Sequence, residues 1–241
     1  MSIHSKFLIH WTGKDFHVPP TSPITSDIRK QYVERLIDDC YSGMYMNIGQ
    51  EVIYGVGGTS ITDSISRICF SEVRLSQVEY HAKHYGMLGI GFQRDFVIQR
   101  QGNPVFYVQN SDEGLVIENL DHVTKYLQAN AKNIKLYGEF AVVCGFLKAM
   151  SERNKSDYTF YEEMEWRIVH TNRLQEKNYC YVQDKNLHIY RLKVSPKDIR
   201  IIIFPDDDTK QMAIKDKDNR FIKFFKDDFP IITTVEDCKN F

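Results

Sequence analysis

The stretch Glu163-Met-Glu-Trp-Arg-Ile-Val169 alternates charged and apolar residues, which predicts a β-strand with one buried face. Successive side chains of a strand point to opposite faces. The apolar face would carry Met164, Trp166 and Ile168. The opposite face would carry three charged residues, Glu163, Glu165 and Arg167, spaced by about 7 Å. Such a row is either a solvated face with a Glu–Arg ion pair or a charged site for a polyhydroxylated or phosphorylated ligand.

The elements on both sides of this stretch define the fold class. Apolar runs predict further strands over 7–11, 65–70, 87–92, 105–108, 179–182, 187–192 and 199–204. Helical spacing predicts helices over about 26–45, 75–85 and 117–150, the last interrupted near 130–133. Residues 205–208 are expected to form an acidic turn, and 221–225 and 230–234 to form edge strands. Because strands and helices do not alternate strictly, we predict an α+β fold with antiparallel or mixed sheets at both ends and helices inserted between them.

Length and composition bound the class of protein. The chain has 241 residues, 42% hydrophobic and 26% charged, with a net charge of −1. These are ordinary globular values, and we predict a single domain over residues 1–241. The near-neutral charge disfavours nucleic acid or a membrane as a partner. The N-terminus lacks the apolar core of a signal peptide, and the five cysteines form no metal or disulfide motif, so we expect a cytoplasmic protein without a bound metal.

Three further segments carry candidate binding residues. His10 and Thr12 share one face of the early strand, where a histidine either binds a ligand or is a core residue with a satisfied hydrogen bond. Ser71 ends an apolar run, where a hydroxyl either binds a ligand or caps the next helix. The Gly89-Ile-Gly91 pair within the segment His81 to Phe92 is not a dinucleotide fingerprint, because the third glycine of that pattern and a following helix are not expected after it. Glycines within a strand allow another backbone or a flat ligand to approach closely.

Five segments, in their order and spacing, carry a resemblance to a known family. They are Leu8-Ile-His-Trp-Thr12, Ile68-Cys-Phe-Ser-Glu72, the glycine-rich segment His81 to Phe92, Pro104-Val-Phe-Tyr107 and Glu163-Met-Glu-Trp-Arg167. Over roughly residues 5–170 this set resembles the abortive phage resistance protein AbiGi family. The resemblance implies the antitoxin half of a bacterial abortive-infection pair. It also implies an AbiGi-like core over 1–170, with residues 171–241 as a strand-rich C-terminal extension of the same domain.

A more distant resemblance concerns chemistry. An early strand with a histidine, an aromatic residue beside glycines and a late Glu-x-Glu strand are similar to the layout of mono-ADP-ribosyltransferases. This implies an ADP-ribosyltransferase-like fold that binds NAD, with three catalytic residues: His10, Glu163 and Glu165. By this comparison Glu165 stabilises the ribosyl cation, Glu163 positions the acceptor and His10 holds the adenosine ribose. The implied cofactor-binding residues are His10, Thr12, Ser71, Tyr85, which stacks on nicotinamide, and Arg167, which pairs with pyrophosphate.

The sequence leaves three functional hypotheses. The first is a phage-defence protein that binds or cleaves NAD, as an NAD-dependent ADP-ribosyltransferase or NAD glycohydrolase. The second is a non-enzymatic antitoxin that binds and neutralises a partner toxin, or a phage or host target protein; in this case Glu165 and Arg167 form a structural ion pair. The third and least supported is a metal-dependent nuclease that uses Glu163, Glu165 and His81.

Overall fold

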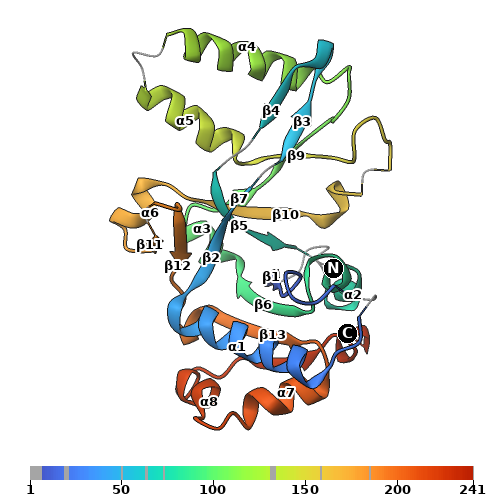
Figure 1. The fold of residues 1–241 in the computed structure, drawn as a ribbon, viewed down its shortest axis with the longest axis vertical. Coiled ribbons are helices and arrows are strands. Elements are labelled where there is room, and N and C mark those ends of the chain that lie inside the picture. The colour runs from blue at the N-terminus through green and yellow to red at the C-terminus, as the bar shows by residue number, and fades with distance from the viewer. Residues whose placement is uncertain are drawn as a thin grey trace.

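A ten-stranded mixed sheet organises the chain (Figure 1). The computed structural model describes residues 7–18, 22–49, 51–62, 65–72, 74–130, 134–157, 159–184 and 186–240. The sheet runs in the order β11 (Cys180–Asp184), β12 (Ile189–Leu192), β2 (Met44–Ile48), β5 (Ser66–Ser71), β1 (Phe7–Thr12), β6 (Leu88–Gln93), β13 (Ile199–Phe204) and β14 (Ile231–Thr234). A side branch is formed by β10 (Glu165–Val169), which pairs with β5 and with β7 (Asn103–Pro104). β13 and β14 are parallel, and the other described pairs of this sheet are antiparallel.

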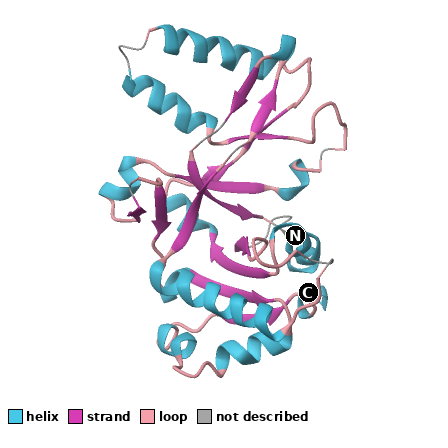
Figure 2. Ribbon diagram, viewed as in Figure 1, coloured by secondary structure: helices cyan, strands magenta, loops and turns pink. Residues whose placement is uncertain are grey.

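Helices surround this sheet (Figure 2). They are α1 (Ser26–Ser42), α2 (Val78–Tyr85), α3 (Arg94–Gln99), α4 (Leu115–Ala129), α5 (Ile134–Cys144), α6 (Asn172–Glu176), α7 (Asp207–Ile214) and α8 (Arg220–Phe224). Helices α4 and α5 lie with the hairpin of β3 (Val52–Tyr54) and β4 (Ser60–Thr62) at one end of the molecule (Figure 1). β8 (Phe106–Val108) and β9 (Leu147–Ala149) form a separate parallel pair. Within the described ranges, no helix is both long and apolar enough to cross a bilayer.

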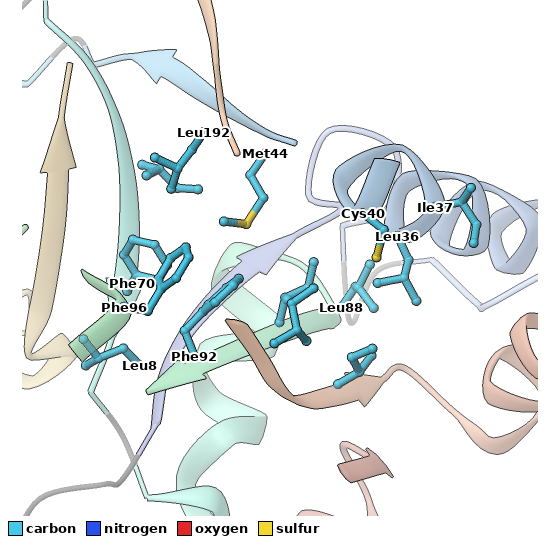
Figure 3. Close-up of a cluster of buried hydrophobic side chains, with 14 of the residues drawn as sticks. Leu8, Leu36, Ile37, Cys40, Met44, Phe70, Leu88, Phe92, Phe96 and Leu192 are labelled. Atoms are coloured by element: carbon cyan, nitrogen blue, oxygen red, sulfur yellow. The ribbon is translucent and has the colours of Figure 1, made fainter. Parts of the chain in front are cut away.

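The two faces of the sheet carry different clusters of buried residues. The larger cluster joins Leu8, Phe70 and Phe92 of the sheet to Leu36 and Cys40 of α1 (Figure 3). Side chains of α3, α6, α7 and α8 complete it. The smaller cluster, on the opposite face, packs α2 against Ile9, Trp11, Ile201 and Ile203. Burial of these apolar side chains holds the sheet between its helices.

The strand β5 is the branch point of the sheet. One of its edges pairs with β10 from Arg67 to Ser71. The other edge is shared, because Arg67 pairs with β2 and Ser71 pairs with β1. The carbonyl of Cys69, between these two pairings, accepts a hydrogen bond from the imidazole of His10. β1 and β2 therefore diverge from β5 and leave a split in the sheet at Cys69.

The structure confirms the α+β class and mixed sheet but corrects several local predictions. The helix predicted to about residue 45 ends at Ser42, and β2 follows Gly43, whose φ is 79°. The predicted edge strand at 221–225 lies in and just after helix α8, because Phe221 and Phe225, one helical turn apart, are both fully buried. The acidic turn at 205–208 is instead the start of α7, capped by the Asp206 carboxylate. The C-terminal region thus contains helices as well as strands, and its strands β12 and β13 pair with β2 and β6.

The long helical prediction over 117–150 is confirmed as two helices, α4 and α5, but it ends too late. Residues 147–149 form the strand β9. Residues 131–133, where the break was expected, lie outside the described residues. The predicted helix over 75–85 is confirmed, with Gly86 at its C-terminal end in a backbone conformation of φ 114°. All five cysteines are free thiols.

Candidate functional site

The split in the sheet opens into a cavity of about 310 Å³, called here the His10 cavity. It is lined by residues of β1, β2, β5, β10 and α2, together with Lys148 and Glu163. Six residues that the sequence singled out line it together: His10, Ser71, Tyr85, Glu163, Glu165 and Arg167. Thr12 does not line this cavity. Residues up to 157 positions apart in the chain therefore meet at one place.

The register of β10 explains how its charged side chains reach the cavity. Glu165 lies opposite Ser71 and Arg167 opposite Cys69, so all four share one face of the sheet. Trp166 and Ile168 point to the other face, where both pack in the larger core cluster. The alternation predicted from the sequence is therefore confirmed from residue 165 onward.

The start of that stretch differs from the prediction. β10 begins at Glu165, and Glu163 ends a short 3-10 helix, Tyr161–Glu163. Met164 adopts a left-handed conformation with φ 44° and is 40% exposed, so it does not belong to the apolar face. This turn nevertheless brings the Glu163 carboxylate beside that of Glu165, because one ammonium contacts both.

Lys148, on β9, is the cation that joins the two carboxylates. Its Nζ lies 2.6 Å from Glu163 Oε2 and also donates to Glu165 Oε2. The other oxygen of Glu165 accepts from Arg167 Nε at 2.5 Å, and the other oxygen of Glu163 accepts from the Tyr85 hydroxyl. Both carboxylates are therefore held from two sides.

These charges are buried, so the alternative of a solvated strand face is wrong, although its Glu165–Arg167 ion pair is present. Glu163 and Glu165 are each 5% exposed, Lys148 is 7% and Arg167 is 1% exposed. Burial alone raises the pKa of Glu165, but Lys148 and Arg167 outweigh it and lower that pKa to about 2. Burial lowers the pKa of Lys148, but the carboxylates of Glu165 and Glu163 raise it by more, so the net shift is upward. The charged forms are thus stabilised as a set, and removal of one partner would leave an uncompensated buried charge.

All three nitrogens of the Arg167 guanidinium are hydrogen-bonded to the protein. Besides Glu165, its guanidinium donates to the carbonyls of Gly145 (3.0 Å) and Leu147 (2.7 Å) and to Glu51 Oε2 (2.6 Å). Every nitrogen of the group therefore has a protein acceptor. Four of its five N–H donors are used in this way. The assignment of Arg167 to a pyrophosphate contact stays a prediction, and a bidentate contact would require exchange of one of these bonds.

His10 presents an acceptor to the cavity. Its Nδ1 lies 2.9 Å from the Cys69 carbonyl oxygen, which can only accept, so Nδ1 carries the hydrogen. Burial lowers the pKa of His10 to about 4, an effect that the Cys69 carbonyl opposes and Arg35 reinforces. The imidazole is therefore neutral at physiological pH, and its Nε2 has a lone pair available for a hydroxyl or amide donor.

Two further side chains have hydrogen-bonding capacity to spare at this cavity. Ser71 is 7% exposed, and its hydroxyl makes no hydrogen bond within the described residues. The amide of Asn47, on β2, is exposed at the cavity wall and likewise has no such bond. With His10 Nε2, these groups offer both donors and acceptors to a polar ligand.

A second cavity of about 600 Å³ adjoins the first and is called here the Asp39 cavity. The two cavities have five lining residues in common: His10, Trp11, Tyr45, Asn47 and Tyr85. Thr12 lines the Asp39 cavity, where its Oγ1 accepts from Arg35 at 2.8 Å. The structure therefore places the predicted Thr12 next to the other predicted residues, but in a neighbouring cavity.

A third hollow has four Tyr and Trp side chains among the fifteen residues that line it. This aromatic cleft, about 1020 Å³ in volume, includes Tyr80, Tyr107, Tyr161 and Trp166. Tyr80 and Tyr161 are 43% and 55% exposed. The Tyr107 hydroxyl accepts a hydrogen bond of 2.8 Å from the backbone N–H of Glu165, so the cleft lies directly behind the charged network.

Several important residues were not found from the sequence. Lys148 lies inside the apolar run Phe146-Leu-Lys-Ala149, and a lysine in such a run signals a buried charge with a partner. Because a helix was predicted over this run, Lys148 was not identified as a buried charge. Glu51 and Asn47 belong to β2 or follow it, and β2 was not predicted. Within the described residues, no group of three or more His, Cys, Asp or Glu side chains is arranged to hold a metal ion.

The fold and site define an α+β protein with a buried charged cavity at a split in a mixed sheet. Its sequence matches the family model described as "Putative abortive phage resistance protein AbiGi, antitoxin" over residues 58–205, more than half of the chain. The chain therefore belongs to the AbiGi family. The match begins after the early strand with His10 and extends beyond residue 170, where the resemblance was expected to end. Neither the curated proteins nor the solved structures include a match.

Proposed function

We propose that this AbiGi family protein binds NAD or a related nucleotide in the His10 cavity, with a layout like that of mono-ADP-ribosyltransferases. The observation that carries the proposal is the convergence of His10, Ser71, Tyr85 and Glu165 on one cavity. These residues come from four separate elements: β1, β5, α2 and β10. The role in abortive-infection phage defence comes from the family.

The cavity suits a ribose-containing group. Its volume of about 310 Å³ lies at the lower end of the range for small-molecule sites, so it would hold one half of a dinucleotide. His10 Nε2 would accept from a ribose hydroxyl, and the Ser71 hydroxyl can donate or accept. The ring of Tyr85 lines the same wall and offers a flat face to nicotinamide.

Cleavage of the ribosyl bond would demand more than binding. A carboxylate beside the sugar stabilises the positive charge that develops on it. Glu165 is ionised at all physiological pH values, because its pKa is about 2. Its oxygens are nevertheless occupied by Lys148 and Arg167. We therefore assign Glu165 the catalytic role only in a complex in which the ligand displaces Lys148, and Glu163 would then retain that lysine.

A second candidate function is favoured by the aromatic cleft. Tyrosine, tryptophan and methionine are enriched at protein interfaces, and exposed Tyr80, Tyr161 and Met164 gather there. In this proposal the chain is a non-enzymatic antitoxin, and the toxin of its pair docks on this cleft. The family description names an antitoxin, which supports this candidate. Tyr161→Ala would weaken the complex with a co-expressed toxin, whereas Ser71→Ala would not.

Isothermal titration calorimetry of the purified chain with NAD tests the first proposal. We expect saturable binding by the native protein and at least fivefold weaker binding by Ser71→Ala, which removes one hydroxyl from the cavity wall. The matched control is Ser60→Ala, a change at an exposed serine on the remote strand β4. No heat of binding with millimolar NAD, or equal affinities of the two variants, would overturn the proposal.

A second measurement separates binding from cleavage. NAD consumption by the native protein is followed by release of free nicotinamide, with and without the toxin of the pair. Turnover that Glu165→Gln abolishes supports the enzymatic role, provided that circular dichroism shows the variant to be folded. Binding without turnover identifies a nucleotide-binding antitoxin.

A further inference from the structure

The Asp39 cavity contains a buried acceptor without a partner. Asp39 lies on α1 and is 3% exposed, and its Oδ2 makes no hydrogen bond within the described residues. Buried polar atoms in native proteins nearly always have a partner, so an unpaired carboxylate oxygen at a cavity wall indicates a missing donor. The same side chain lines the cavity of about 600 Å³.

The neighbouring cations do not satisfy this carboxylate. Arg35, one turn earlier on α1, donates to Thr12 Oγ1 at 2.8 Å and to Asp15 Oδ2 at 2.6 Å. Arg191 donates to Asp38 Oδ2 and to the carbonyl of Gly43, both at 2.7 Å. The two guanidinium groups that act on the charge of Asp39 thus donate their hydrogen bonds to other acceptors. Burial, the largest cause, raises the pKa of Asp39 to about 7, in agreement with an uncompensated site.

The position of the cavity relates it to the proposed nucleotide site. It shares His10 and Tyr85 with the His10 cavity, so the two hollows meet at these side chains. Lys14 lines the Asp39 cavity, and its Nζ lies 5.9 Å from the centre of the Tyr85 ring. An ammonium group therefore lies near the junction of the two cavities, where a phosphate that links two halves of a ligand would pass.

We propose that the Asp39 cavity holds the adenosine half of the dinucleotide, with the Asp39 carboxylate as acceptor for a ribose hydroxyl and Lys14 as the pyrophosphate contact. This inference rests on the proposed function, in which the nicotinamide half occupies the His10 cavity. Carboxylates bind ribose hydroxyls in this way in other dinucleotide sites. Tyr45 lines both cavities and offers an aromatic ring to the base.

Titrations with the separate halves of NAD test the inference. Native protein, Asp39→Asn and Ser71→Ala are each titrated with NAD, AMP and nicotinamide mononucleotide. Asp39→Asn should weaken NAD and AMP at least tenfold and leave nicotinamide mononucleotide unchanged. Ser71→Ala should weaken NAD and nicotinamide mononucleotide but not AMP. The control is Asp27→Asn, at an exposed aspartate on the same helix.

The outcomes separate this inference from the proposed function. If Ser71→Ala weakens NAD binding and Asp39→Asn does not, the Asp39 assignment is overturned while the nucleotide site stands. If the native protein binds neither NAD nor nicotinamide mononucleotide, the proposed function fails. AMP binding that Asp39→Asn still weakens would then support the Asp39 cavity as an independent nucleoside site. Equal AMP affinity of Asp39→Asn and Asp27→Asn would overturn it.

Discussion

The two cavities that meet at His10 differ in whether their buried carboxylates have partners. In the His10 cavity, Lys148 and Arg167 hold the carboxylate of Glu165, and Lys148 and the Tyr85 hydroxyl hold that of Glu163. In the Asp39 cavity, a carboxylate of similar burial has an oxygen without a hydrogen-bond partner among the described residues. The first arrangement stabilises the fold around a branch in the sheet. The second costs stability, and a ligand that donates a hydrogen bond would recover that cost.

The largest expected effect is a loss of stability when the carboxylates of Glu163 and Glu165 lose the cation that they share. Lys148→Met leaves two buried carboxylates without their shared cation, and we expect a loss of about 3–5 kcal/mol in the free energy of unfolding. Urea denaturation followed by circular dichroism measures it. The control is Lys135→Met, at a lysine that is 88% exposed on α5. Equal midpoints for the two variants would show that the network adds no stability.

Acid should weaken the same network. The folded-state pKa of Glu165 is lowered to about 2 from an ordinary value of 4.5, so its stabilising contribution is complete above about pH 4.5 and is lost as the pH falls toward 2. The contribution is on the order of 3 kcal/mol. Denaturant midpoints measured from pH 6 to pH 2.5 should fall more steeply for native protein than for Glu165→Gln. Parallel curves would contradict the assignment, and Glu139→Gln, at an exposed position of α5, is the control.

The carboxylate of Asp39 should change the stability of the fold with pH in the opposite direction to that of Glu165. The folded-state pKa of Asp39 is raised to about 7, so the stability that its protonation provides is present below about pH 4 and is lost as the pH rises through 7. The titratable and charged groups that act on it or line its cavity are His10, Lys14, Asp15, Arg35, Asp38, Tyr45, Tyr85, His188 and Arg191. Asp39→Asn should therefore stabilise the chain at pH 8, by about 2 kcal/mol, and by much less at pH 4. Thermal melts at both pH values test this, and a variant less stable than native protein at pH 8 would contradict it.

The smallest effect on stability should come from the cavity wall itself. Ser71→Ala removes a hydroxyl that makes no hydrogen bond to the part of the chain that the structure describes, so the free energy of unfolding should change by less than about 0.5 kcal/mol. Its effect is expected in ligand affinity alone. A loss of stability above about 1 kcal/mol would show that the hydroxyl has a structural role.

Periodicity in the sequence predicted most of the strands and the polar face of β10. Trp166 and Ile168 pack in the core while Glu165 and Arg167 face the cavity, because strand alternation is a local property of the chain. Periodicity failed where tertiary contacts decide. A strand was predicted around Phe221 and Phe225, but the two buried side chains lie one helical turn apart. β2 was not predicted, because the predicted helix extended into its residues.

The candidate site was also predicted only in part, because the sequence shows residue types but not their tertiary partners. The residue types that carry the chemistry, His10, Ser71, Tyr85 and Glu165, stand out in the sequence, and the structure brings them to one cavity. Their partners could not be predicted, because Lys148 reaches Glu165 only through the pairing of β9 with β8 and the return of β10 beside them. The expected role of Arg167 in ligand binding is the most affected, since the fold already uses all its nitrogens.

The central claim is that His10 presents a neutral Nε2 to a bound nucleotide, and NMR of the imidazole nitrogens tests it most directly. In ¹⁵N-labelled protein, the His10 resonances are assigned by their loss in His10→Asn. At pH 7 the account predicts a neutral ring with hydrogen on Nδ1, and a shift of the Nε2 resonance on addition of NAD. The resonances of His122, on α4 and away from both cavities, should not move. A hydrogen on Nε2, or a His10 spectrum unchanged at saturating NAD, would contradict the account.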